Sequence, residues 1–210
     1  HIAKCGYHGW GDWHAVSLRD HGVPKSLNDI IHEFEYNNLD SLETILQAHE
    51  CAGVIMEAQA LTSPDPGFLE GVRALCDSYG ALLIFDEVIT GFRVSLGGAQ
   101  EYFGITPDLS IYGKSLGAGY PIGALAGKDS LMGYLDPSSE NGGHIFSIGS
   151  FHSNPLCSTA ALHCIKELKK NFSYEKLNNY GDGLRSGLSE IFKQYDLPHV
   201  MTGLGSIVEF

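Results

Sequence analysis

Short apolar runs that alternate with amphipathic stretches constrain the fold of this 210-residue chain more than any other feature. Brief aliphatic runs bounded by glycine, proline or charged residues are typical of strands buried inside a sheet. Strands are predicted over residues 2–5, 53–57, 81–86, 109–112 and 122–126. The alternation therefore predicts an α/β fold, with a mostly parallel sheet layered with helices.

The stretches between these runs predict helices, because their apolar side chains recur at close to a 3.6-residue period. The best-defined start is Asn154-Pro155, since asparagine is a good N-cap and proline suits the first helical turn. Helices are predicted over residues 40–48, 68–79, 154–171 and 174–195. The last residues, 205–210, predict a further strand after the glycines at 203 and 205.

Composition excludes several classes of protein. With 43% hydrophobic and 18% charged residues the chain can bury one sizeable core, and its net charge of −12 opposes binding to nucleic acid or anionic lipid. No basic leader and no run of about 18 apolar residues is present, so a cytoplasmic setting is expected. The five cysteines are scattered and the ten histidines dispersed, which predicts reduced thiols, no disulfide framework and no metal site.

An aspartate and a lysine follow neighbouring predicted strands. Asp86 ends the run 81–86, and Lys114 follows the run 109–112 between Gly113 and a further glycine-rich turn. In open α/β sheets ligands bind at the carboxyl ends of the strands. An isolated aspartate there could also cap a turn or pair with Arg93, but a lysine that forms an imine and an aspartate that holds a ring nitrogen protonated are the two groups that pyridoxal phosphate (PLP) chemistry needs.

The segment from Asp86 to Lys128, DEVITGFRVSLGGAQEYFGITPDLSIYGKSLGAGYPIGALAGK, resembles the signature of the class III aminotransferases of fold type I. Within that family the sequence of this segment is most similar to the glutamate-1-semialdehyde aminomutases and related aminotransferases. The resemblance implies that residues 1–200 are part of the large PLP-binding domain and that 201–210 begin the C-terminal small domain. It also implies a central fragment, because the family's phosphate-binding loop precedes the matched region and the small domain follows it.

The resemblance assigns roles to residues of this chain. Lys114 would carry PLP as a Schiff base and Asp86 would pair with the pyridine nitrogen, which makes these two the expected catalytic residues. Val88 would pack on one face of the ring. Tyr7, from a Tyr-His-Gly turn, would stack on the other face, and the neighbouring His8 is expected to have a hydrogen-bonding role.

Glu57 and Ser150 complete the expected cofactor-binding set. Glu57 ends a strand where the family usually has Glu-Pro, but Ala58 follows here, and both support of the cofactor and capping of a turn remain open. The segment GSFHSNP resembles the family's Gly-Thr-x-x-x-Asn-Pro, whose hydroxyl reaches the PLP phosphate of the neighbouring subunit. Ser150 would be that hydroxyl, and the implied assembly is a homodimer, although a turn or capping role is the alternative.

The implied activity is that of a transaminase, which moves an amino group from a small donor to a carbonyl acceptor. An aminomutase, which moves the group within one substrate, is an alternative that the motifs do not separate. A non-catalytic PLP-fold chain is the alternative from another class, and absorbance of lysine-bound PLP would discriminate it. The substrate stays open, because Trp10 stands where some relatives carry an arginine that binds a carboxylate.

Overall fold

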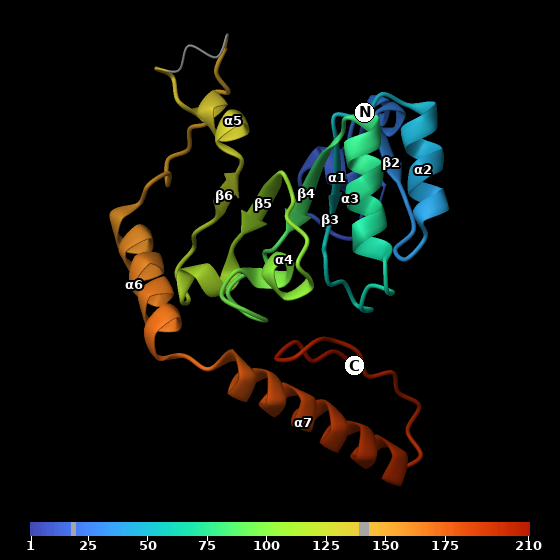
Figure 1. The fold of residues 1–210 in the computed structure, drawn as a ribbon, viewed down its shortest axis with the longest axis vertical. Coiled ribbons are helices and arrows are strands. Elements are labelled where there is room, and N and C mark those ends of the chain that lie inside the picture. Colours follow the sequence, from blue (N-terminus) through green and yellow to red (C-terminus); the bar gives the residue numbers. More distant parts are fainter. Residues whose placement is uncertain (18–19, 139–142) are drawn as a thin grey trace.

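A six-stranded sheet in the order β2-β1-β3-β4-β5-β6 forms the centre of the fold (Figure 1). The computed structural model describes residues 1–17, 20–138 and 143–210. The strands are β1 (Ile2–Cys5), β2 (Ile31–Glu33), β3 (Gly53–Met56), β4 (Leu82–Asp86), β5 (Leu109–Tyr112) and β6 (Ala124–Gly127). All neighbouring strands are parallel except β6, which runs antiparallel to β5. The predicted fold class is confirmed, and each predicted strand before residue 200 lies within two residues of its observed bounds.

The four predicted helices are all present. The α-helices are α1 (Asp12–Ala15), α2 (Leu39–Ala48), α3 (Phe68–Tyr79), α4 (Gly98–Phe103), α5 (Asp129–Met132), α6 (Pro155–Asn171) and α7 (Tyr174–Gln194). The described residues also form three short 3₁₀ helices, η1 (Lys25–Asp29), η2 (Lys114–Gly117) and η3 (Gly133–Leu135). The side chain of Asn154 caps α6 as predicted, accepting hydrogen bonds from two backbone N–H groups of its first turn.

The core lies between the sheet and the helices α2 and α3, which cover one face of its β1–β4 half (Figure 1). Its fully buried side chains include Leu42 and Val72 from the helices and Val54, Leu83 and Phe85 from the central strands. Burying one side chain of this size contributes about 1.5–3 kcal/mol. The core therefore fixes β3 and β4 rigidly, up to their carboxyl ends.

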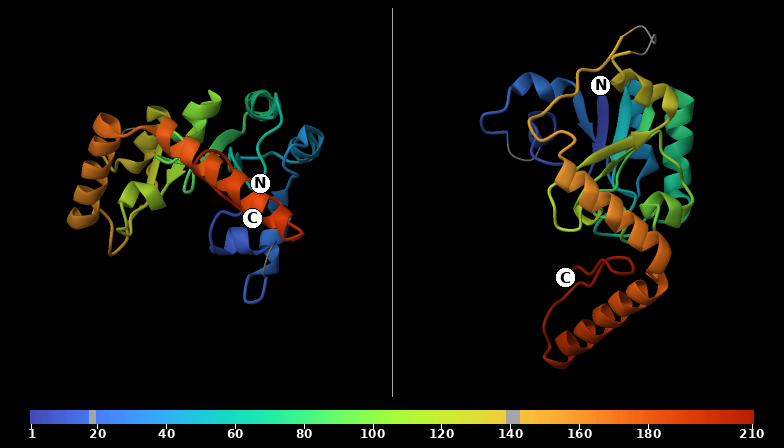
Figure 2. Two further views of the ribbon diagram at one scale, coloured as in Figure 1. Left: turned by 90° about the horizontal axis from the view of Figure 1, so that it is seen from below. Right: turned by 90° about the vertical axis from the view of Figure 1, so that its left-hand side faces the viewer.

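The long helices α6 and α7 lie outside this layer, and the C-terminal segment turns back between α7 and the sheet (Figures 1 and 2). The guanidinium of Arg185 on α7 holds that segment, donating to the carbonyl oxygens of Gly205 (2.7 Å) and Ile207 (2.6 Å). The division into a large domain over 1–200 and the start of a small domain at 201–210 stays a prediction.

The predicted strand at 205–210 is wrong. Thr202 and Glu209 form an isolated antiparallel bridge, and the chain reverses direction between them. Gly203 (φ 113°) and Gly205 (φ 52°) have left-handed backbones, and a Cβ at Gly203 would lie 2.1 Å from the carbonyl oxygen of Ile207. Glycines in these conformations close a tight reversal, which an extended strand does not accommodate.

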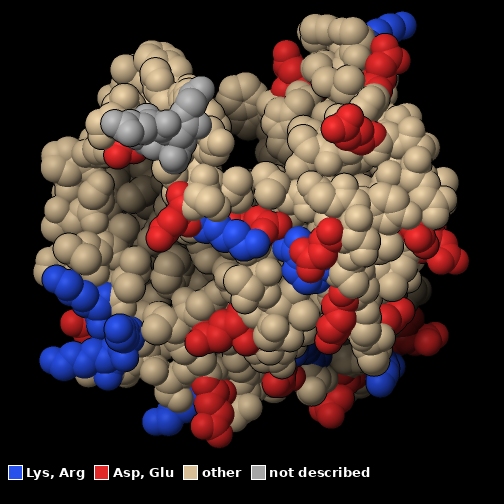
Figure 3. Space-filling view, turned by 45° about the horizontal axis from the view of Figure 1, so that its top comes forward, with Lys and Arg blue, Asp and Glu red and all other residues tan. Residues whose placement is uncertain are grey.

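Acidic side chains are spread over the surface seen in Figure 3, with lysine and arginine side chains in small groups between them. This distribution matches the net charge of −12. All five cysteines are free thiols, as predicted, and four of them are buried. Among the helices of the described ranges, none is both long and apolar enough to cross a membrane.

Candidate functional site

A cavity of about 210 Å³ lies at the carboxyl ends of β1, β3, β4 and β5. Six of the seven predicted site residues line it, namely Tyr7, His8, Glu57, Asp86, Val88 and Lys114. The indole of Trp13 lines it as well, with its ring parallel to that of His8 at 6.5 Å. Residues that are far apart in the sequence converge here because parallel strands deliver their carboxyl ends to one edge of the sheet.

Ser150 does not line this cavity. It lies in a separate, more open hollow of about 860 Å³, between the segment before β6 and the segment before α6. Two apolar side chains of this hollow are strongly exposed, Ile148 and Phe151, at 73% and 85% of full exposure. The structure of one chain thus brings together six of the predicted residues and leaves the seventh apart.

Asp86, the last residue of β4, is buried and hydrogen-bonded on both carboxylate oxygens. Oδ1 accepts the backbone N–H of Val88 (3.0 Å), and Oδ2 lies 2.8 Å from Nδ1 of His8. The other ring nitrogen of His8 lies 2.9 Å from the carbonyl oxygen of Cys5. The imidazole of His8 thus bridges the carboxylate of Asp86 and the backbone at the end of β1.

A second layer of buried polar groups supports His8, and sequence reasoning missed it. The ring of His14 accepts the backbone N–H of His8 (3.2 Å), and burial, with the charges of Lys4 and His8, lowers the pKa of His14 to about 4. His14 is therefore neutral at physiological pH. Lys4 is fully buried and paired with Glu33. The sequence does contain a signal for this buried ion pair, the single lysine inside the apolar run IAKC, because a buried ammonium requires a partner.

Lys114 is separated from β5 by Gly113 alone and is the first residue of η2. Its φ of 42° is left-handed, a conformation that is uncommon for residues other than glycine. The turn is held by the backbone N–H of Leu116, which donates to Gly113 (3.0 Å), and by the thiol of Cys164 on α6, which donates to the carbonyl oxygen of Ser115 (3.5 Å). Strained backbone of this kind persists where its surroundings over-determine it, as at ligand-binding sites.

A buried network connects the carboxyl ends of β4, which ends at Asp86, and β5, which precedes Lys114. The carboxylate of Glu87 accepts the hydroxyl of Thr90 and the backbone N–H of Gln100 (2.8 Å). The side-chain amide of Gln100 donates to the hydroxyl of Tyr112 (2.6 Å) at the end of β5. The spacing of the two candidate catalytic groups is thus fixed by side chains that do not enter the cavity.

Glu57 is half-buried at the cavity, and burial raises its pKa to about 7, with the charge of Asp86 adding to the effect. The charges of His8 and Lys114 act in the opposite direction. In the described part of the chain the carboxyl of Glu57 has no hydrogen-bond partner, so nothing there favours the turn-capping alternative. Near neutral pH a substantial share of Glu57 is protonated, and its carboxyl can then donate as well as accept a hydrogen bond.

This raised pKa predicts a pH dependence of stability. Between the ordinary value of 4.5 and about 7, the folded protein holds the Glu57 proton more firmly than the unfolded chain does. The free energy of unfolding of the cofactor-free protein should therefore fall as pH rises through this range. Urea unfolding across the range should show a flatter profile for Glu57→Gln. The same change at the exposed Glu190 serves as control, and equal slopes in all three proteins would contradict the assignment.

Comparisons with known proteins bear on this site. The model of a family described as "Aminotransferase class-III" matches residues 14–210. A protein of Brevibacillus brevis named glutamate-1-semialdehyde 2,1-aminomutase 2 is 41% identical over 193 residues, which are 89% of this chain and 44% of that protein.

Solved structures agree with the sequence matches. An omega-transaminase from Sphaerobacter thermophilus superimposes with a TM-score of 0.85 at 31% identity, over 97% of this chain and 51% of the other. The PLP internal aldimine form of the FumI protein of Sphingopyxis sp. MTA144 gives a TM-score of 0.86 at 28% identity, over 99% of this chain and 50% of the other. The chain spans about half the length of the relatives it matches.

Proposed function

The chain belongs to the class III aminotransferase family, and from this premise we propose that the whole protein transfers amino groups with PLP as its cofactor. The observation that carries the proposal is the position of Asp86 and Lys114, which end or follow the adjacent strands β4 and β5 and line one cavity. A buried carboxylate and a primary amine on one small cavity are the two protein groups that PLP chemistry requires.

The residues present fit this cofactor. Each carboxylate oxygen of Asp86 accepts one hydrogen bond from the protein and retains capacity for another, so the group can accept a ring N–H. Val88 offers an apolar surface beside it, and the aromatic ring of Tyr7 lines the same cavity. Glu57 adds a carboxyl that can donate a hydrogen bond near neutral pH.

When bound, PLP supplies a positively charged ring that accepts the electron pair released at the substrate Cα. In this chain Asp86 would hold the proton on the ring nitrogen, and His8 would fix the position of the Asp86 carboxylate through their hydrogen bond. The Nζ of Lys114 would hold the cofactor at its aldehyde carbon, with the aldehyde oxygen leaving as water, and would serve as the base that moves a proton at the substrate Cα. The network of Glu87 and Gln100 would keep these two groups at a constant spacing.

Borohydride reduction of the full-length protein with PLP tests the assignment of the lysine. Reduction makes the lysine–cofactor bond permanent, and peptide mass spectrometry should then find the pyridoxyl mass on Lys114. A Lys169→Ala variant, altered at an exposed lysine of α6, should label equally. Bound PLP with the label on another residue, or with no label, would refute the role of Lys114. Label on Lys114 without any turnover would favour the non-catalytic alternative.

An aminomutase is the second candidate function, favoured by the relative from Brevibacillus brevis, whose name states that activity. The two activities differ in whether a second substrate is needed. Conversion of glutamate 1-semialdehyde to its 5-amino isomer by the protein alone would support the aminomutase. Turnover that needs a separate amino donor and a carbonyl acceptor would support the transaminase.

The cytoplasm is the compartment that fits either activity, and the five free thiols support it.

A homodimer is the proposed assembly, with Ser150 completing a phosphate site in the partner subunit. Two exposed apolar side chains, Ile148 and Phe151, line the same hollow as Ser150, and exposed apolar patches mark interaction surfaces. The hydroxyl of Ser150 also lies shortly before the start of α6, where the helix dipole favours a phosphate dianion.

Ser150→Ala should weaken both PLP retention and PLP-promoted dimerisation, because a shared phosphate site couples the two by mass action. Light scattering of the full-length protein, with and without PLP, measures the association. Ser186→Ala is the matched control, since the hydroxyl of Ser186 donates within α7 to the carbonyl oxygen of Asp182. A strictly monomeric protein with full PLP occupancy would rule out the shared site.

A further inference from the structure

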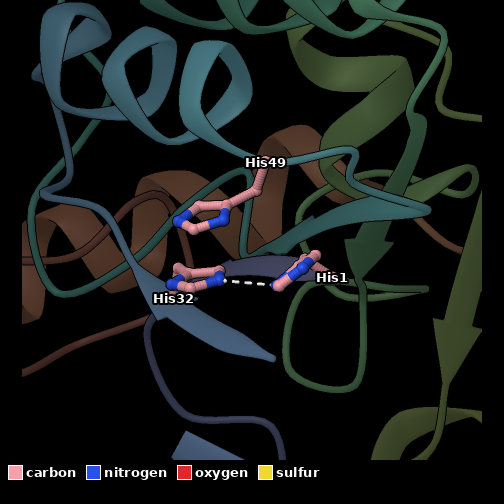
Figure 4. A group of neighbouring side chains, drawn as sticks. All are labelled: His1, His32 and His49. Atoms are coloured by element: carbon pink, nitrogen blue, oxygen red, sulfur yellow. Dashed lines mark hydrogen bonds between the residues drawn. The ribbon is translucent and has the colours of Figure 1, made fainter. Parts of the chain in front are cut away.

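Three imidazole rings lie together at the end of the sheet opposite the cavity (Figure 4). His1 precedes β1, His32 lies in β2, and His49 is the C-cap of α2. One nitrogen from each ring lies within 4.8 Å of the other two. We propose that these three histidines form a binding site for a divalent transition metal, with Zn²⁺ as the ion that suits them.

The fold itself brings the rings together. Ala3 of β1 pairs in register with His32 of β2, which places His32 on the face of the sheet that α2 covers. Nδ1 of His1 lies 2.9 Å from Nε2 of His32, and the rings of His32 and His49 are stacked with centroids 3.9 Å apart. Three segments separated in sequence therefore bring their imidazoles close together.

The hydrogen bonding favours three imidazoles that bind a metal ion, and it disfavours three protonated rings. The nitrogens of His1 and His32 lie 2.9 Å apart and form a hydrogen bond, in which one nitrogen donates and the other accepts. The accepting nitrogen carries no proton, so at least one of the two rings is neutral and has a lone pair. Within residues 1–17, 20–138 and 143–210, no carboxylate forms a salt bridge with any of the three histidines. A cation bound by neutral imidazoles satisfies the lone pairs without placing several protonated rings side by side.

The location also suits a cation. His49 ends α2, and its backbone N–H donates to the carbonyl oxygen of Ile45, so the partly negative end of the helix faces the cluster. Imidazole is a preferred ligand of zinc, and three histidines leave a fourth position for water at this accessible place. The parallel rings of His32 and His49 do not converge on one point as they stand. His49, partly exposed at the helix end, is the ring that would turn to complete the site.

A bound ion would join β1, the edge strand β2 and α2. The edge strand is only three residues long, so a bond from His32 to an ion shared with His1 and His49 would stabilise this edge of the sheet. The site is separate from the proposed cofactor cavity, and its occupancy should be independent of PLP.

Zinc binding to the full-length protein, prepared without a polyhistidine tag, tests the proposal. The protein is stripped with a chelator, exposed to Zn²⁺ with and without PLP, and separated from free ion. Plasma mass spectrometry should find about one Zn²⁺ per chain in both states, and circular dichroism should show a rise in Tm of about 5 °C. His49→Gln and His32→Gln should each lose the ion and the shift in Tm.

The control is His163→Gln, a change at an exposed histidine of α6 that should leave zinc binding intact. Zinc content that is equal in the parent protein and in His49→Gln would overturn the proposal, as would the absence of zinc from the parent protein. His49 is partly exposed at a helix end, so its variant decides the outcome even if His32→Gln fails to fold. Zinc bound only in the absence of PLP would also overturn it, because that result points to the cofactor cavity.

Discussion

Lys114→Ala should lower the rate of amino transfer on the order of a thousandfold or more in the full-length protein. The alanine removes both the amine proposed to bond to PLP and the base proposed to move a proton at the substrate Cα, and no other lysine lines the cavity as described. PLP held by non-covalent contacts should remain, but its absorbance should be that of the free aldehyde. The measurement is single-turnover kinetics together with the absorbance spectrum.

Lys169→Ala is the matched control, because it removes an exposed lysine without touching the cavity. A Lys114→Ala protein that turns over at a rate close to the parent's would contradict the central assignment. Loss of activity together with loss of folding would show in the circular dichroism spectrum, and Lys114→Arg, which keeps the charge and the length, then separates the two effects.

Asp86→Asn should reduce turnover on the order of a hundredfold to a thousandfold while keeping much of the bound PLP. The amide fills the same space and can still accept a hydrogen bond, but it has no charge with which to hold the ring nitrogen protonated. It also leaves the imidazole of His8 without its anionic partner. Turnover and PLP content should therefore separate, and measuring both in one preparation checks this expectation.

Asp136→Asn, a change at an exposed aspartate, is the control for this series. A near-parental rate for Asp86→Asn would show that ring protonation does not depend on this carboxylate. The proposed function would then rest on Lys114 alone.

Much of the fold could be predicted because the central strands β3 and β4 are largely buried and are therefore apolar along most of their length. The exact bounds of β5 and α3 followed from such runs and from a clear helical period. The end of the chain could not, because 205–210 is as apolar as a strand while its conformation is set by Gly203 and Gly205. Local composition does not reveal a reversal that depends on close backbone packing.

The candidate site divides in the same way. Asp86 and Lys114 could be placed at one edge because parallel strands deliver their carboxyl ends together. The support from His14 could not be foreseen, since it depends on a hydrogen bond to a backbone N–H after the chain has folded. The cluster of His1, His32 and His49 is hidden for another reason, because its members come from three elements and share no spacing in the sequence.

The left-handed backbone of Lys114 bears on how this protein can change over evolutionary time. A side chain at φ 42° costs about 1–2 kcal/mol that glycine would not incur, so selection for folding alone would favour a smaller residue there. Under the proposed role, the lysine is expected to persist only while its chemistry is selected. Lineages that lose the activity are therefore expected to replace the lysine early. Lineages that keep the activity must offset the cost of this backbone elsewhere, so we expect lower tolerance to new substitutions around η2 than along the rest of the sheet edge.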